Sequence, residues 1–352
     1  MIKQIKALFL PLRQAMYDFE EQSVTRAMRA LFSENAQIKM PFPLGEMQGP
    51  DALYQNCYAP LLAAFPDIER RDFIVMGGQS EQGDYWLGCG GHYFGTFAVP
   101  WLDIPPNGHM THMRYHEFYR FEGDKIVEMQ AIWDIPEVMM QSNAWPMSPS
   151  LGWEGFVPAP ATLDGIINTP HDKDQAQTSC QLIVDMLKHL VKYPSQGGPQ
   201  VMQMDEFWHP RMNWYGPAGI GSGRGIQGFR HWHQIPFLSA MPDRGQHEEL
   251  IEHHFFGDAN YAAVTGWPNM CQTISDDGWL GIAPSGKRIT MCSLDFWRVE
   301  NGKIRENWVL VDILDVYHQL GVDVFKRLRE FNKARISGTI TYPMREPQDA
   351  VS

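Results

Sequence analysis

The chain carries one pattern twice, which restricts it to folds that are built from two similar halves. The segment at 104–134 recurs at 282–312, a shift of 178 positions (282 − 104). A repeat of this length indicates a duplicated domain, because solenoid units span only about 20–50 residues. A feature that both copies keep therefore suggests fold, and a feature that one copy keeps suggests chemistry. Identical residues at both places include Pro106/Pro284, Gly108/Gly286, Met113/Met291, Phe118/Phe296, Arg120/Arg298, Lys125/Lys303, Ile126/Ile304, Glu128/Glu306 and Asp134/Asp312.

A second block upstream supports the duplication. Leu-Ala-Ala-Phe-Pro-Asp at 62–67 returns as Leu-Ser-Ala-Met-Pro-Asp at 238–243, at a shift of 176 positions (243 − 67). Between the two copies lies a stretch rich in Pro, Gly and Ala that lacks periodicity and is typical of a linker. We therefore predict domains at 1–142 and 171–335, a linker at 143–170 and a tail at 336–352.

The composition is that of an acidic globular chain. The formal net charge of −12 argues against nucleic-acid binding, which needs a basic face. No apolar stretch approaches the roughly 20 residues of a membrane span, so we expect no membrane partner. The five cysteines are scattered without a CxxC pair, which indicates free thiols in a reducing compartment. We expect a cytoplasmic protein.

Each copy places its helices before its strands. In the first copy, apolar residues at helical spacing predict helices at 1–35 and 51–65. A hairpin turn at 122–124 separates the last two strands, and Asn-Gly at 301–302 takes its place in the second copy. This order is typical of the α+β class, with a curved antiparallel sheet over helices in each half. The predicted strands of the first copy lie at 68–76, 85–97, 110–121 and 125–133.

Five segments of the first copy are similar to one known family. They read Gly-Pro-Asp-Ala-Leu (49–53), Pro-Leu-Leu-Ala-Ala-Phe-Pro-Asp (60–67), Gly-His-Tyr-Phe-Gly (91–95), Ile-Pro-Pro-Asn-Gly (104–108) and Tyr-Arg-Phe-Glu-Gly-Asp-Lys-Ile-Val-Glu (119–128). In this order they resemble the SnoaL-like polyketide cyclase family of the nuclear transport factor 2-like superfamily. The resemblance covers nearly all of 1–140 and, more weakly, 175–321.

The resemblance implies a fold and a pocket. Family members are α+β cones with a deep apolar pocket between sheet and helices, and they pair sheet to sheet. The duplicated chain is thus expected to form two tandem cone-shaped α+β barrel domains, arranged as an intrachain pseudo-dimer that could pair further as a homodimer. Because this superfamily hosts many activities, function has to be argued from the site.

The family's catalytic positions are changed in both copies. The resemblance implies an Asp base on the last strand and a His on the strand before it. The Asp position falls on Ala131 and Val309, and the His position falls on Glu117 and Asp295. Each half is therefore expected to offer one carboxylate in place of the usual pair.

The strand at 110–121 has two faces, and one of them suits a pocket. That face carries Tyr115, Glu117 and Tyr119. A carboxylate among apolar neighbours is suited to act as a general base, although pairing with an arginine or a tyrosine for structure alone is the alternative. Asp295 has the corresponding place beside Trp297, and Trp86 and Trp133 are candidate pocket walls.

His92 belongs to the first copy alone and is a candidate general acid or substrate donor. A structural, hydrogen-bonded strand histidine is the alternative. Asp134 and Asp312 occur in both copies and could contact substrate, but each also has the position of an N-cap before a helix, which we favour.

Two further motifs do not support a cofactor. His231 and His233 are expected on a helix, where residues two apart point about 200° from each other, so we predict no metal site. Gly223-x-Gly225-x-x-Gly228 follows no predicted strand, which argues against dinucleotide binding.

Taken together, these features predict a small-molecule pocket protein. We expect cofactor-free acid–base chemistry on a hydrophobic, oxygenated ligand: cyclisation, isomerisation or dehydration. Glu117 and His92 of the first copy would act, and Asp295 would be the twin of Glu117. The alternative is a non-catalytic binding module in which the second domain is a structural partner.

Overall fold

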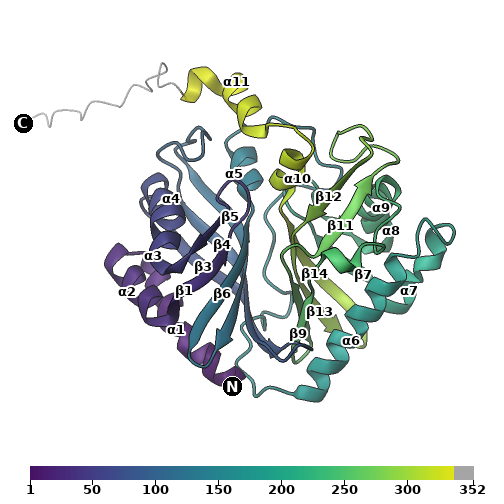
Figure 1. The fold of residues 1–352 in the computed structure, drawn as a ribbon, viewed down its shortest axis with the longest axis horizontal. Helices are drawn as coiled ribbons and strands as arrows, with labels where there is room; N and C mark the ends of the chain where they lie inside the picture. Colours follow the sequence, from purple (N-terminus) through teal and green to yellow (C-terminus); the bar gives the residue numbers. More distant parts are fainter. Residues whose placement is uncertain (337–352) are drawn as a thin grey trace, which may run out of the picture.

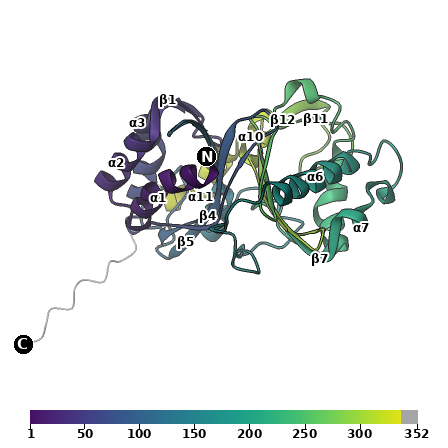
Figure 2. The ribbon, with the colours of Figure 1, turned by 90° about the horizontal axis from the view of Figure 1, so that it is seen from below.

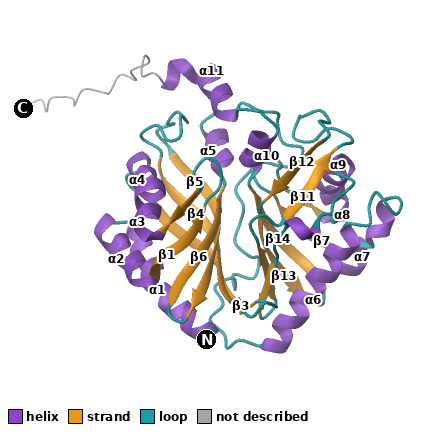
Figure 3. Ribbon diagram, viewed as in Figure 1, coloured by secondary structure: helices purple, strands orange, loops and turns teal. Residues whose placement is uncertain are grey.

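The computed structural model describes residues 1–336, and it shows two halves of similar architecture side by side (Figure 1). In each half, helices cover one face of a six-stranded sheet, and the other faces of the two sheets meet at the centre (Figures 2 and 3). The first half, domain 1, consists of α1 (Ile2–Asp18), α2 (Glu21–Leu31), β1 (Phe32–Lys39), β2 (Glu46–Gln48), α3 (Gly49–Leu53), a π-helical turn (Tyr54–Tyr58), α4 (Ala59–Ala64), β3 (Glu69–Gln79), β4 (Tyr85–Thr96), β5 (Met110–Glu122), β6 (Lys125–Trp133) and α5 (Ile135–Gln141).

The second half, domain 2, follows the same plan after the linker. It consists of α6 (Lys173–Leu190), a 3-10 turn (Pro199–Met202), α7 (Met204–Phe207), β7 (Trp208–Tyr215), β8 (Gly223–Arg224), α8 (Gly225–Phe229), a π-helical turn (Arg230–Gln234), α9 (Ile235–Ala240), a 3-10 turn (Glu248–Leu250), β9 (His254–Asp258), β10 (Tyr261–Thr265), β11 (Met270–Ile274), β12 (Lys287–Met291), β13 (Ser293–Glu300), β14 (Lys303–Val311), α10 (Ile313–Gln319) and α11 (Val324–Ile336).

The two six-stranded sheets have the same strand order, β2-β1-β6-β5-β4-β3 and β8-β7-β14-β13-β10-β9. The predicted α+β class is confirmed. The expectation of purely antiparallel sheets is wrong, because β1 pairs parallel to β6 and β7 parallel to β14. β1 begins inside the segment that was predicted as helix. The buried residues of β1 are Phe32, Ala36 and Ile38, and they alternate with exposed residues only over a short stretch. This short alternation follows directly on residues at helical spacing, so the sequence does not show where the helix ends and the strand begins.

The sheets pack on each other through twins of the duplication. The Phe118 ring stacks on Phe296, with centroids 4.9 Å apart and an interplanar angle of 18°. His116 Nδ1 lies 2.6 Å from the carbonyl oxygen of its own twin, Leu294. Gly88 permits this approach, since a Cβ there would lie 2.8 Å from Phe296. The halves are thus related like the subunits of a dimer within one chain.

Asp134 and Asp312 also join the two halves. Asp134 Oδ2 accepts a hydrogen bond from Ala218 N at 2.9 Å, and Asp312 Oδ2 accepts one from Phe42 N at 2.8 Å. Asp312 in addition caps α10 by accepting a hydrogen bond from Asp315 N at 3.1 Å, as predicted, whereas the Asp134 side chain accepts no capping hydrogen bond from α5 within the described chain. Both carboxylates therefore take part in the contact between the domains, in addition to the N-cap position that the sequence favoured for them.

The C-terminal helix α11 returns to domain 1. Arg329 Nη1 lies 2.8 Å from Asp103 Oδ2, and Arg335 Nη2 donates to the Ser142 carbonyl at 2.7 Å. The predicted tail begins at the last residue of α11, and its remainder, 337–352, lies outside the described residues. Among the helices of the described range, none combines the length and apolarity that a membrane span requires.

Replacing Phe296 by Ala is expected to lower the free energy of unfolding by about 3–5 kcal/mol, because it removes a fully buried ring from the contact between the sheets. Phe331→Ala is the matched control, since that ring on α11 is 74% exposed and should change little. Urea unfolding of both variants measures the difference. Equal stability of the two variants would contradict the role given to the stacked pair.

Candidate functional site

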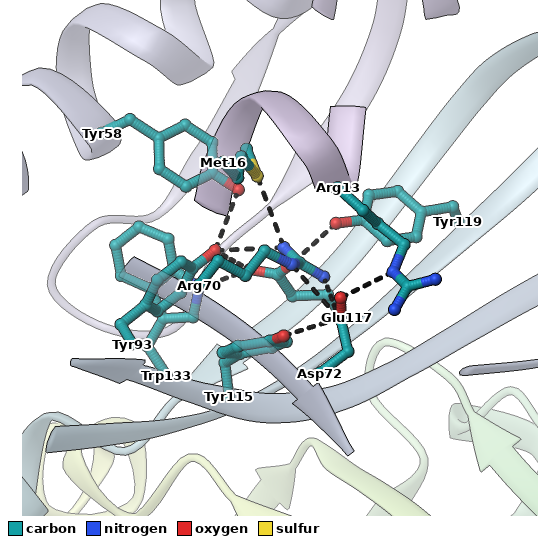
Figure 4. A network of polar contacts seen from close by, with 10 residues as sticks. All are labelled: Arg13, Met16, Tyr58, Arg70, Asp72, Tyr93, Tyr115, Glu117, Tyr119 and Trp133. Carbon is teal, nitrogen blue, oxygen red and sulfur yellow. Dashed lines mark hydrogen bonds and ion pairs between the residues drawn. The ribbon is translucent and has the colours of Figure 1, made fainter. Parts of the chain in front are cut away.

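Glu117 on β5 lies in the interior of domain 1, but its carboxylate is fully occupied (Figure 4). Oε1 accepts from Tyr93 OH at 2.8 Å and from Trp133 Nε1 at 2.9 Å. Oε2 accepts from Tyr119 OH at 2.5 Å and from Arg70 Nη1. A carboxylate has about four acceptor positions, so these four donors saturate it. Glu117 therefore has the structural pairing that the sequence left as the alternative to a base.

Arg70 extends this network to a second buried carboxylate. Its Nη2 lies 3.0 Å from Asp72 Oδ1, which also accepts from Tyr115 OH at 2.6 Å, and Arg13 Nε donates to Asp72 Oδ2 at 2.7 Å. Burial alone would raise the pKa of Asp72, but Arg70 and Arg13 outweigh it and hold the pKa below its ordinary value. The predicted pocket residues Tyr115, Tyr119 and Trp133 thus serve as donors inside a filled core (Figure 4).

The other predicted residues of domain 1 lie on the opposite face of the sheet. His92 on β4 stacks on Phe156 of the linker, with centroids 4.8 Å apart, and burial lowers the pKa of His92 to about 3. Trp86 packs among the residues between the sheets, with its ring 5.1 Å from His254 of domain 2. The structure therefore does not bring His92 or Trp86 to Glu117. Side chains on β4 alternate between the two faces of the sheet. Glu117 pairs with Cys89, so the odd-numbered residues of β4 share its face, whereas Trp86 and His92 point to the other face.

A shortened strand distinguishes domain 2 from domain 1. β3 has 11 residues, and its first four include Arg70 and Asp72. The corresponding β9 has only 5 residues. Because both strands end at the hairpin to the next strand, the missing part is the part that carries the arginine and the aspartate in domain 1. Domain 2 is left without the side chains that fill the other interior.

Domain 2 contains a cavity of about 100 Å³ between its sheet and helices. An outer pocket of about 220 Å³ adjoins it. The two share Leu187, Arg244, His253, Phe255, Asn269 and Met270, so the outer pocket is the entrance to the cavity. The wall of the inner cavity is mainly apolar and includes Trp208, Trp214, Trp279 and Trp297.

Asp295 on β13 lines this cavity, unlike its saturated twin. Its Oδ1 accepts a hydrogen bond from Ser293 Oγ at 2.6 Å, and part of its side chain remains accessible. Burial raises the pKa of Asp295 to about 7, although the Ser293 hydrogen bond and the charge of Arg244 oppose that rise. Near neutral pH this carboxyl therefore exists in both protonation states, as an acid–base group requires.

Two further polar residues line the cavity. His233 stacks on Trp214 with centroids 3.9 Å apart, and burial lowers the pKa of His233 to about 3, so its ring is neutral. Arg244 lies in the loop after α9, with its guanidinium carbon 5.0 Å from the centroid of Phe237. His231 is exposed, whereas His233 lines the cavity, so the two histidines point in different directions as predicted.

The sequence reasoning named neither His233 nor Arg244 as a site residue. The duplication contained the signal, because their twins at a shift of 176 are Cys57 and Ile68, and only domain 2 has polar groups there. In the first copy, the donors around Glu117 leave its carboxylate no acceptor position for a ligand.

A family model described as SnoaL-like polyketide cyclase matches residues 11–142 and 199–320, which together make up more than half of the chain. The chain belongs to the SnoaL-like polyketide cyclase family. No curated protein matches it.

Several solved structures are similar to one half of this SnoaL-like protein. IdmH from Streptomyces antibioticus, assigned as a polyketide cyclase, is 18% identical, with 40% of this chain and 99% of that chain covered and a TM-score of 0.34. A protein from Jannaschia sp. CCS1, assigned as a SnoaL-like polyketide cyclase, is 18% identical over 40% and 91%, with a TM-score of 0.34. A SnoaL-like polyketide cyclase from Agrobacterium tumefaciens is 18% identical over 39% and 96%, with a TM-score of 0.31.

In this SnoaL-like polyketide cyclase family member, the carboxylate of each half lies on the strand before the last one. Asp295 pairs across the strands with Val309, and Glu117 pairs with Ala131. The carboxylate that the family resemblance places on the last strand is therefore found on the neighbouring strand, directly opposite. An acidic group thus stands in the same part of each interior.

Glu117→Gln is expected to lower the free energy of unfolding by about 3 kcal/mol, because the fully buried Arg70 would lose one of its two carboxylate partners. Asp51→Asn is the matched control, since it removes the exposed Arg29–Asp51 pair at a similar N–O distance and should leave stability unchanged. Urea unfolding at neutral pH tests both. An unaffected Glu117→Gln variant would argue that the network does not support the fold.

Asp295→Asn is expected to stabilise the protein more at pH 8 than at pH 5. The pKa of Asp295 is higher in the folded state than in the unfolded chain, so its contribution to stability is full below about pH 4 and is lost as pH rises through about 7. The variant should therefore gain roughly 1–3 kcal/mol on the wild type between the two pH values. Urea unfolding at each pH measures this, and a constant difference would refute the raised pKa.

Proposed function

We propose that domain 2 carries out cofactor-free acid–base chemistry next to a carbonyl group of a hydrophobic, oxygenated small molecule. The reaction classes that fit are cyclisation, isomerisation and dehydration. The observation that carries the proposal is Asp295, a cavity-lining carboxyl whose pKa is raised to about 7 by burial. A base of that strength can take a proton from carbon beside a carbonyl and can return it at another position.

The surroundings of Asp295 support this role. The apolar wall excludes water and strengthens charge interactions in the cavity. The neutral ring of His233 and the indole nitrogens of Trp208 and Trp297 are polar groups in that wall, and His233 Nδ1 and both indole nitrogens lack hydrogen-bond partners among the described residues. Oxygen atoms of a bound ligand would provide acceptors for indole N–H groups after small adjustments of the side chains.

Domain 1 contributes packing to this proposal. Arg114 donates from Nη2 to the Val309 carbonyl at 3.2 Å, and Val309 lines the domain 2 cavity. The filled half thus holds one strand of the hollow half in place. All five cysteines are free, and for that reason we also place the protein in a reducing compartment such as the cytoplasm.

Exchange of carbon-bound protons tests the proposed base directly. We expect the wild type to accelerate deuterium uptake at the α-carbon of 1-tetralone, an apolar ketone, by about 100-fold over buffer in D₂O, measured by proton NMR. Asp295→Asn should return the rate close to that of buffer. Glu248→Gln is the control, because Glu248 lines the outer pocket and not the inner cavity.

The pH dependence distinguishes Asp295 from another base. The rate should rise as pH increases through about 7 and level off above it, because the ionised carboxyl takes the proton. Ser293→Ala should move the midpoint to higher pH, since it removes a hydrogen bond that favours the ionised form. Exchange that survives Asp295→Asn would refute the proposal, and ligand binding without any exchange would favour a binding module.

A further inference from the structure

Arg244 is a charged side chain at the entrance of the cavity without a partner. It lines both the inner cavity and the outer pocket, so its guanidinium stands where the two meet. It makes no hydrogen bond or ion pair through its side chain with any residue of the described range, and its ring contact is with Phe237. Asp295 attracts it through space but lies too far away for an ion pair.

The loop that carries Arg244 is built alike in both halves up to that residue. Asp243 holds it in domain 2, because Asp243 Oδ1 accepts from Thr273 N at 2.8 Å. Asp67, the twin of Asp243, likewise accepts from Thr96 N at 2.5 Å in domain 1. The next residue is the buried Ile68 in domain 1 and Arg244 in domain 2. The anchoring aspartate therefore belongs to the fold, whereas the arginine is specific to the hollow half.

The charge of Arg244 is not balanced inside the cavity. Burial lowers the pKa of Arg244 to about 10, yet the group stays charged at neutral pH. Asp295 is partly protonated there, and burial lowers the pKa values of His233 and His253, which favours their neutral forms. Arg244 is half-buried, and a charge that is largely removed from water is normally paired, because the cost of desolvation is otherwise uncompensated. An anionic ligand group would supply the missing partner.

We infer that Arg244 binds a carboxylate group of the ligand, and that the substrates of this site are amphiphilic carboxylic acids. The planar guanidinium matches a carboxylate with two parallel hydrogen bonds. The apolar body of the ligand then lies in the inner cavity beside Asp295, and its carboxylate lies at the entrance. The inference rests on the proposed function for the location of the site and adds the class of substrate.

A pair of probes that differ only in charge tests this inference. Isothermal titration calorimetry with 2-naphthoate and 2-naphthamide at pH 7.5 should show that the wild type binds the carboxylate about 10- to 100-fold more tightly than the amide. Arg244→Met should remove this preference and leave the affinity for the amide within about threefold. Unchanged amide binding also shows that the variant is folded with its cavity intact.

Lys188→Gln provides the matched control. Lys188 also lines the outer pocket, but it pairs with Asp185 at 3.4 Å, so its loss should leave the preference for the carboxylate in place. Equal affinity of the wild type for the two probes, binding of neither probe, or a preference that survives Arg244→Met would overturn the inference. Asp295→Asn should keep the preference, so a protein that selects the carboxylate but exchanges no protons would refute the proposed reaction alone.

Discussion

The packing of one sheet against the other is the constraint on which the rest of this structure depends. It covers one face of each sheet, with Phe118 and Phe296 stacked at the centre, so the interior of each half lies on the face that the helices cover. It also makes each half a support for the other. Arg114 is almost fully buried and donates to backbone carbonyls of β14 and of the loop after β7, which fixes a wall of the domain 2 cavity from outside. The filled half thus supports a wall of the hollow half.

The two interiors illustrate the cost and the use of a buried carboxylate. Glu117 has its four acceptor positions filled, so this carboxylate stabilises the core and has no acceptor position left for a ligand. Asp295 has one hydrogen bond and a raised pKa, which means that its ionised form is poorly compensated and that folding loses free energy as the group ionises. Poor compensation is what leaves this group able to exchange protons near neutral pH. The duplication therefore places a stabilising network and a carboxyl of raised pKa at the same position of one fold.

Much of the fold could be predicted from the sequence, because the duplication and the alternation of residues in β5 are local or regular signals. They predicted the two domains, the long strands and the inward direction of Glu117. The saturation of Glu117 could not be predicted in this way, since Arg70 lies 47 positions away on a strand whose register only the folded sheet defines. The same applies to His92, whose face depends on the pairing of β4 with β5. That the hollow lies in domain 2 follows from the shorter β9, which periodicity alone does not show.

Under the proposed function, the separation of Arg244 from Asp295 would couple ligand binding to proton transfer. In domain 1, Arg70 and Arg13 hold the pKa of Asp72 below its ordinary value, so a direct arginine contact would make Asp295 a weak base. At its actual distance Arg244 lowers the pKa of Asp295 only in part. A carboxylate bound to Arg244 would cancel much of that attraction and place a second negative charge near Asp295. Both effects raise the proton affinity of Asp295, so the base becomes stronger when an acidic ligand occupies the cavity.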